Sequence, residues 1–255
     1  MEVFYSDSTK LLGNAAAQHA KRIIDWAIEK RGTARIVLST GASQFAFFEA
    51  FVACDIDWPR VEVFHLDEYI GISEEHKASF CKYLVERFSA LLPKKLKRLH
   101  LISGQGDPHE TIKRIGAELM RAPVDLGMIG IGENAHIAFN DPPADFETEE
   151  PYIIVNLDKK CKAQQVGEGW FRSEDEVYDQ AITMGCRQIM RCGHIISFVP
   201  YASKAAAVES VLNADTVTPA VPATLLKTHK DFSLYLDKDS AKKILRSKSF
   251  PMVEV

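Results

Sequence analysis

Short apolar runs alternate with amphipathic segments along most of this chain. The runs at 34–39 (ARIVLS) and 61–66 (VEVFHL) are rich in β-branched and aromatic residues, and each is followed by a loop and a segment of helical spacing. Parallel strands need a helix-containing crossover of this kind between them. Nearly continuous apolar strands are typical of a parallel sheet that is covered on both faces. The pattern therefore predicts an α/β fold with a doubly wound, Rossmann-like, mostly parallel sheet and helices on both faces.

The rest of the chain continues the alternation. Further strands are expected at 98–103, 125–131, 152–157 and 194–200, and helices at 9–31, 45–52, 76–92, 107–121 and 203–213. Ser8 is the expected cap at the start of the first helix, and Gly32 is its expected stop. No linker rich in Pro, Gly or Ser divides the sequence, so 1–255 is predicted to be a single domain. The least regular segment, 140–185, is a candidate lid over a site.

Composition excludes several functional classes. The chain has 31 Lys and Arg against 35 Asp and Glu, without a basic block that could neutralise a row of phosphates, so no nucleic-acid partner is expected. Its five cysteines form no CxxC pair, which favours reduced thiols over disulfides or a zinc site. The first residues do not form a signal peptide, and no apolar run approaches the length of about 18 residues that spans a bilayer. We therefore expect a cytoplasmic protein without membrane contact.

The turn STGASQ (39–44) follows the first predicted strand. In an α/β sheet, ligands bind beyond the carboxyl ends of the strands, so this turn lies at the expected binding edge. The backbone N–H groups of Thr40, Gly41, Ala42 and Ser43, together with the following helix start, can hold a phosphate. The alternative is an ordinary strand-to-helix turn with Ser43 as its N-cap. Because neither a P-loop nor GxGxxG is present, no dinucleotide is implied.

The second predicted strand ends in HLDEYIG (65–71), which contains two carboxylates. Adjacent residues of an extended chain point to opposite sides, so we expect at most one of Asp67 and Glu68 to face a ligand. Asp67 is the candidate. A partly buried carboxylate can act as general base on a carbon-bound proton, because burial brings its pKa closer to the working pH. The alternative role is that of a loop aspartate capping the next turn.

The stretch GIGENAHIAFNDPP (130–143) follows another predicted buried strand and carries one histidine. His136 therefore lies where a ligand is expected. Asn134 and Asp141 can hydrogen-bond its imidazole and fix the tautomer, as general acid/base catalysis requires. The alternative is a purely structural histidine.

Two lysines are candidate phosphate ligands. Lys204 lies in the first turn of the helix predicted at 203–213, where the helix dipole disfavours a cation unless an anion is close by. Lys162 is a second candidate within LDKKCKAQQ. The alternative for both residues is a solvated surface lysine.

Taken together, these motifs resemble those of the glucosamine-6-phosphate deaminase family and its wider fold group, which includes the 6-phosphogluconolactonases, over nearly the whole chain. STGAS is similar to TGGTP of the family, HLDEYIG to MDEY-x-G, and GIGENAHIAFNDP to GxGxDGHIAFNEP. HIAFN followed by an acidic residue and proline favours the deaminase branch. Lactonases tend to carry DER where this chain has Asp67-Glu68-Tyr69. The resemblance implies the fold shared by deaminases, ribose-phosphate isomerases and CoA transferases.

The same resemblance implies a reaction and a set of roles. It implies conversion of an amino-sugar 6-phosphate to a ketose 6-phosphate with release of ammonia, without cofactor or metal. His136 then opens the sugar ring, and Asp67 moves the C2 proton toward C1. Ala42, Ser43, Lys204 and Lys162 hold the phosphate. The expected partner is a small sugar phosphate, and a homo-oligomer remains open.

The chain departs from the family pattern around the histidine. Asn134 replaces an aspartate, Asp141 replaces a longer glutamate, and Ala135 replaces a glycine. An amide brings no negative charge to an imidazolium, and the shorter carboxylate has less reach. Lys162 stands where family members often carry arginine, so it keeps the charge without the bidentate fork. These departures leave open another sugar phosphate, or an already open chain, as the substrate.

Two alternatives to a deaminase and one regulatory expectation follow. One alternative is a 6-phosphogluconolactonase-like hydrolase in which His136 activates water and Asp67 is a bystander. The other is a non-catalytic sugar-phosphate sensor that retains only the phosphate cradle. The Ser and Arg/Lys cluster that binds an allosteric sugar phosphate in some bacterial deaminases corresponds to ADFETEEPYI (144–153), which is acidic. We therefore expect no activation by N-acetylglucosamine 6-phosphate.

Overall fold

The structure is a computed structural model that describes residues 1–245 and 251–255. Its main sheet contains β1 (Glu2–Ser6), β2 (Ala34–Leu38), β3 (Val61–His65), β5 (Arg98–His100), β6 (Leu126–Met128), β9 (His194–Val199), β10 (Phe232–Asp237) and β11 (Val253–Glu254). The strand order is β11-β1-β10-β9-β6-β2-β3-β5, and every neighbouring pair is parallel. A parallel sheet of this kind was the fold predicted from the apolar runs.

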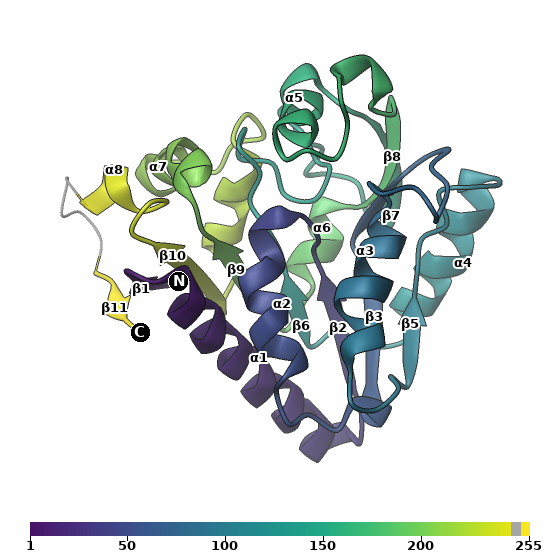
Figure 1. Ribbon diagram of the computed structural model, residues 1–255, viewed down its shortest axis with the longest axis horizontal. Helices are drawn as coiled ribbons and strands as arrows, with labels where there is room; N and C mark the ends of the chain where they lie inside the picture. Colours follow the sequence, from purple (N-terminus) through teal and green to yellow (C-terminus); the bar gives the residue numbers. More distant parts are fainter. Residues whose placement is uncertain (246–250) are drawn as a thin grey trace.

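Helices connect and flank the strands (Figure 1). They are α1 (Thr9–Arg31), α2 (Phe45–Val52), α3 (Phe80–Arg87), α4 (Pro108–Met120), α5 (Lys159–Gly167), α6 (Cys186–Met190), α7 (Ala205–Asn213) and α8 (Lys242–Leu245). Short 3₁₀ turns occupy Ala42–Gln44, Trp58–Arg60, Ser89–Leu91, Glu174–Glu176, Ala202–Lys204 and Pro222–Thr228. Ser8 caps α1 by accepting the Leu11 N–H at 3.3 Å, and Gly32 ends the helix with a φ of 78°, as expected. Among the described helices, none is both long and apolar enough to cross a membrane.

The alternating side chains of the strands bury two apolar layers. In β2, Ile36 and Leu38 belong to the cluster that packs against α1 and α2. Val37, between them, points to the opposite face, where α4 and α7 contribute Ile115 and Val208. Both faces of the sheet are therefore covered by helices, which confirms the predicted α/β class.

A second, smaller sheet differs from the prediction. Residues 152–157 were expected to join the parallel sheet, but β7 (Tyr152–Asn156) pairs antiparallel with β8 (Gln180–Met184), which pairs antiparallel with β4 (Asp67–Tyr69). An apolar run such as YIIVN has the same periodicity in either sheet, so the pattern did not reveal its partner. The sequence reasoning also missed β1 and β10, although β10 is buried at all six positions.

Several predicted helix bounds were too wide. The helix expected at 76–92 is α3, which begins after the Ser79 cap, and a 3₁₀ turn follows it. The helix expected at 203–213 begins later, because Ala202–Lys204 forms a 3₁₀ turn ahead of α7.

The path of the chain places a crevice at the middle of the sheet. From β2 the chain winds outward through β3 to β5, and it then returns to β6 on the other side of β2. Ligands of doubly wound sheets bind at such a reversal, outside the carboxyl ends of the two strands. The turn after β2 and the loop after β6 meet there. In Figure 1, α5 lies at the top of the view, beyond the main sheet.

Candidate active site

A cavity of about 60 Å³ lies at this crevice. Loops after three neighbouring strands, β2, β3 and β6, contribute to its wall, which is why residues far apart in sequence meet there. Of the residues selected from the sequence, six line it: Thr40, Gly41, Ser43, Asp67, His136 and Lys204. The groups that the sequence suggested for anion binding and those that it suggested for proton transfer therefore line one small cavity.

His136 is held by a hydrogen bond at one nitrogen of its imidazole. Its Nδ1 lies 2.8 Å from Asp141 Oδ1, and both side chains are largely buried. The aspartate therefore reaches the ring despite its shorter side chain. Because the carboxylate is an acceptor, the contact favours the tautomer that is protonated at Nδ1. The other nitrogen, Nε2, lies beside Gly132 at the cavity wall and has no hydrogen-bond partner among the described residues, so it can accept or deliver a proton.

Asn134 was expected to hydrogen-bond the imidazole, but its side chain bonds to Asp141 and to the His136 backbone instead. Its amide donates to Asp141 Oδ1 at 3.0 Å, and its carbonyl accepts the His136 N–H at 3.1 Å. The Asp158 N–H donates to Asp141 Oδ2 at 3.1 Å. Burial alone raises the pKa of Asp141, but hydrogen bonds from His136 and Asn134 outweigh it and leave that pKa lowered. The carboxylate is thus held ionised as an acceptor for the imidazole.

The backbone before the histidine is unusual. Ala135 adopts a φ of 66°, in the left-handed region that favours glycine. The Ala135 carbonyl accepts the Ala223 N–H at 2.9 Å, so the turn is fixed by a second segment of the chain. A residue with a Cβ therefore occupies the position where the family pattern has glycine, at a cost in backbone strain.

Asp67 and Glu68 point to different surroundings, as the alternation of an extended chain requires. Asp67 lines the cavity, and among the described residues its carboxylate has no hydrogen-bond or ion-pair partner. Burial, with a smaller contribution from the Glu68 charge, raises the pKa of Asp67 well above its usual value. Glu68 instead accepts the Cys81 N–H at 2.8 Å and the Ser79 hydroxyl at 2.9 Å. It anchors the start of α3.

Lys204 is buried to 4% exposure at the edge of the cavity. Within the described chain, its ammonium makes neither a hydrogen bond nor a salt bridge. Burial lowers the pKa of Lys204, and the nearby Glu168 and Glu133 carboxylates oppose this shift. A buried, unpaired ammonium is costly unless an anion accompanies it. This environment is what an anion-binding lysine requires.

The STGAS turn lines the same cavity as Lys204. Gly41 has a φ of 104°, which only glycine adopts readily, and its carbonyl accepts the Tyr83 hydroxyl at 2.9 Å. The 3₁₀ turn that begins at Ala42 leads directly into α2. The first N–H groups of such a helical start have no partner within the helix, so they are free to bind an anion.

Four sequence-selected residues are not part of the cavity wall, and one of them, Asp141, contributes through its hydrogen bond to His136. Lys162 lies on the outer side of α5, where its ammonium contacts Asp179 Oδ1 at 2.5 Å. The structure therefore does not bring Lys162 together with Lys204. Lys162 instead lines a separate surface pocket together with Lys159 and Asp179. Ala42 and Asn134 lie next to the cavity without lining it.

The cavity also contains residues that sequence reasoning missed. Gln164, Gln165 and Glu168 line it from α5 and the GEGW turn, within the segment predicted as a lid. Two buried polar atoms of the wall, Ser39 Oγ and Gln165 Oε1, have no hydrogen-bond partner among the described residues. Buried polar atoms of this kind are usually hydrogen-bonded by a ligand or an ordered water. Helical spacing in AQQVGE was the available signal, because it places these side chains on one face.

Potential metal ligands occur in two places among the described residues. His136, Asp141 and Cys161 have donor atoms within 4.8 Å of one another, as do His65, Glu68 and Cys81. In the first group the imidazole and carboxylate bond directly to each other. In the second, Glu68 is occupied by α3 and the Cys81 thiol contacts the Ile102 carbonyl at 2.9 Å. Hydrogen bonding within the protein already uses most of these groups.

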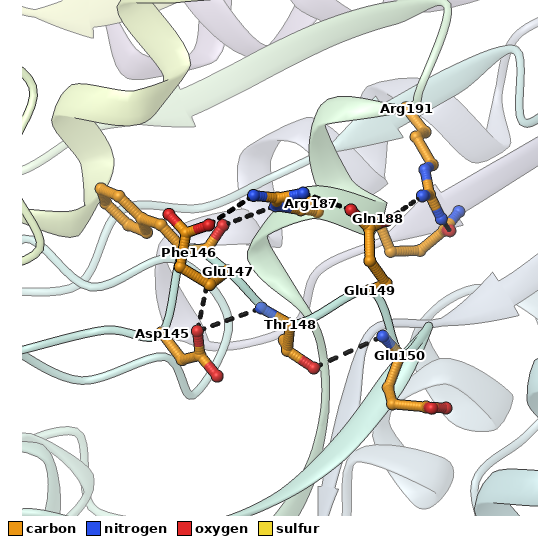
Figure 2. Close-up of polar contacts among 9 residues, drawn as sticks. All are labelled: Asp145, Phe146, Glu147, Thr148, Glu149, Glu150, Arg187, Gln188 and Arg191. Carbon is orange, nitrogen blue, oxygen red and sulfur yellow. Dashed lines mark hydrogen bonds and ion pairs between the residues drawn. The ribbon is translucent and has the colours of Figure 1, made fainter.

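The acidic segment 145–150 is tied to the helix α6 and its end by arginines (Figure 2). Arg187 contacts Glu147 at 2.5 Å and also pairs with Glu149, which pairs in turn with Arg191. Both arginines are therefore engaged by carboxylates of this segment. The absence of activation by a sugar phosphate at this segment stays a prediction.

Comparisons with known proteins agree with the geometry. The sequence profile of the family described as glucosamine-6-phosphate isomerases/6-phosphogluconolactonase matches residues 7–235. A glucosamine-6-phosphate deaminase of Thermoanaerobacter sp. (strain X514) is 30% identical over 88% of this chain and 89% of that protein. The solved structure of a monomeric glucosamine-6-phosphate deaminase superposes with a TM-score of 0.86 at 24% identity, covering 95% of this chain and 99% of the other.

Lactonases share the fold at lower similarity. The structure of 6-phosphogluconolactonase from Trypanosoma brucei superposes with a TM-score of 0.76 at 15% identity, covering 95% of this chain and 98% of that one. At that identity the likeness concerns the fold. The profile match over most of the chain and the deaminase relative establish the family. The chain belongs to the family of glucosamine-6-phosphate isomerases and 6-phosphogluconolactonases.

Proposed function

We propose that this protein is a hexosamine-6-phosphate isomerase/deaminase that converts an amino-sugar 6-phosphate and water to a ketose 6-phosphate and ammonia. The observation that carries the proposal is the cavity in which Asp67, His136 and Lys204 meet. An aldose-to-ketose conversion needs a base for a carbon-bound proton as well as an acid/base for the ring. Lactone hydrolysis requires only the second, so the unpaired Asp67 carboxylate favours the isomerase/deaminase.

The roles follow from the surroundings of each group. His136, held at Nδ1 by Asp141, transfers a proton at the ring oxygen through Nε2 and opens the sugar. Asp67 then removes the C2 proton and returns a proton to C1, while the aldehyde oxygen gains a proton and the amino nitrogen loses one, which turns the amino aldose into a C2 imine. Water adds to this imine, and the carbon–nitrogen bond breaks to leave the ketone and ammonia. Lys204 and the STGAS turn hold the phosphate, and Ser39 and Gln165 pair with sugar hydroxyl groups.

An ammonia-release assay over a panel of hexosamine 6-phosphates tests this proposal. We expect release from a gluco- or galacto-configured amino-sugar 6-phosphate and none from the unphosphorylated amino sugars, because Lys204 would lack its anion. Non-amino hexose 6-phosphates and 6-phosphogluconolactone complete the panel. Consumption of the lactone alone would replace the proposal by a hydrolase, and binding without turnover would replace it by a sensor.

Gly132→Ala is expected to lower turnover on the order of 10²-fold, because small displacements of a catalytic group cost that much. A Cβ at Gly132 would lie 2.2 Å from His136 Nε2, so the imidazole must move. Gly130→Ala is the matched control, since its nearest contact would be an ordinary 3.7 Å. The test compares the steady-state rates of the two variants. Their melting temperatures show whether both fold. Equal rates for both would argue against Nε2 as the reacting atom.

Glu68→Gln is expected to move the acidic limb of the pH–rate profile to lower pH. Burial and the Glu68 charge raise the pKa of Asp67, so removing that charge lowers it and leaves the base ionised in more acidic solution. The amide keeps an oxygen that can accept the Cys81 N–H at the start of α3. The profile of kcat/KM against pH is the measurement. An acidic limb that stays in place or moves upward would show that Asp67 does not set it.

A further inference from the structure

The GEGW turn places a carboxylate over the STGAS turn. Glu168 Oε2 lies 3.7 Å from the position that a Cβ on Gly41 would occupy, which brings it close to the Gly41 backbone. The carboxylate is fixed from two sides, because Trp170 Nε1 donates to Oε2 at 3.0 Å and Gln164 Nε2 donates to Oε1 at 2.8 Å. A negative group of this protein therefore stands within the site assigned to the ligand's anion.

The charges around Lys204 also place the Glu168 carboxylate near the proposed anion site. Lys204 has no direct partner among the described residues, and the Glu168 carboxylate is the strongest charged influence on it. Both side chains line the one cavity with Gly41 and Ser43. Glu168 thus partly neutralises the buried ammonium in the free protein.

A phosphate that binds between the STGAS turn and Lys204 would meet the Glu168 carboxylate, which lines the same cavity and lies beside Gly41. Like charges repel strongly in a partly buried site, so phosphate binding favours a retreat of Glu168. The start of α5 is tied to the His136–Asp141 pair through the Asp158 N–H, at 3.1 Å from Asp141 Oδ2. The other end of α5, which carries Glu168, is the end that can leave without breaking that tie.

We propose that Glu168 competes with the phosphate of the ligand for the cradle formed by the STGAS turn and Lys204. In the free protein the carboxylate occupies the place of a phosphate oxygen, and ligand binding expels it. Glu168 is then an affinity-determining residue for phosphorylated ligands. The inference rests on the proposed function only in assuming that this cavity binds a sugar phosphate.

Titration of the full chain with inorganic phosphate tests the competition without turnover. We expect Glu168→Gln to bind phosphate about tenfold more tightly, since removal of a like charge at this range is worth roughly a tenfold change in affinity. Glutamine retains the shape and can still accept the Trp170 N–H. Affinity for an unphosphorylated amino sugar should stay the same. Glu133→Gln is the control, because Glu133 is the other acid near Lys204 but is exposed, and its removal should change phosphate affinity by less than about twofold.

Trp170 provides an independent readout of the same movement. Phosphate should change the tryptophan emission as Glu168 leaves the indole N–H, and the change should vanish in Trp170→Phe. Unchanged or weaker phosphate binding by Glu168→Gln would overturn the inference, as would a phosphate response that Trp170→Phe retains. Tighter phosphate binding without ammonia release from any hexosamine 6-phosphate would support the inference and overturn the deaminase. Ammonia release with unchanged phosphate affinity would do the reverse.

Discussion

Asp67→Asn is expected to reduce ammonia release by about 10³-fold or more while the sugar phosphate still binds. Loss of a general base commonly costs 10²–10⁴-fold, and the amide has the same shape without the basic oxygen. Asp67 has no partner among the described residues, so its replacement breaks no hydrogen bond that positions the loop. The expected signature is a fall in kcat with a nearly unchanged dissociation constant for substrate.

Asp67→Asn should raise the free energy of unfolding although it lowers activity. Burial and Glu68 raise the folded-state pKa of Asp67, so folding favours the protonated acid. This preference costs the wild-type protein stability as pH rises above the unfolded-state value. The amide of the Asp67→Asn variant cannot ionise, so the stability advantage of the variant should grow with pH over that window. Urea unfolding of both proteins at acidic and neutral pH measures the difference.

The control and the contrary outcomes are specific. Asp179→Asn changes an exposed carboxylate that pairs with Lys162 outside the cavity, and it should leave turnover intact. Ammonia release retained by Asp67→Asn would remove Asp67 from the mechanism. Lactone hydrolysis retained by the same variant would favour the hydrolase. Binding without turnover in both wild type and variant would favour the sensor.

The sequence predicted the main sheet because its strands obey a local rule. β2, β3, β6 and β9 are short apolar runs followed by helices, and their parallel pairing follows from those connections. The three-stranded sheet depends on pairing between β4, β7 and β8, which lie far apart in the chain. Periodicity contains no information about such partners, so β7 was assigned to the wrong sheet.

The same distinction separates the predicted from the missed parts of the cavity. Asp67 comes shortly after β3, and His136 lies in the loop that follows β6. Because the ends of parallel strands share one edge of the sheet, their meeting was predictable. Gln165 and Glu168 reach the cavity only because α5 folds back over that edge. The two lysine candidates were alike in sequence, but packing buries Lys204 and leaves Lys162 with Asp179. The sequence also did not show whether the Asp141 carboxylate reaches the His136 imidazole. That contact depends on the shape of the turn between them, which residue types alone do not determine.

Lys204→Met is expected to weaken binding of phosphorylated ligands on the order of 10²-fold. A charge-assisted hydrogen bond to phosphate contributes about 2–3 kcal/mol, and methionine fills a similar volume without supplying it. The loss should appear in KM and in the dissociation constant for inorganic phosphate. Lys162→Met is the matched control, because that ammonium pairs with Asp179 outside the cavity and should not affect phosphate. Equal losses in both variants would contradict the assignment of the cradle to Lys204.

The same substitution should make the free protein more stable, by on the order of 1–2 kcal/mol, because a buried and unpaired cation is replaced by an apolar group. Burial lowers the folded-state pKa of Lys204, so the cost to wild type is full below that pKa and shrinks as pH rises toward the ordinary lysine value. The advantage of methionine should therefore be largest near neutral pH and decline in alkaline solution. Saturating phosphate should reverse the order, since the wild-type protein binds it more tightly and gains more binding energy. A Lys204→Met variant less stable than wild type without phosphate would mean that the ammonium has a structural role rather than a stored capacity to bind an anion.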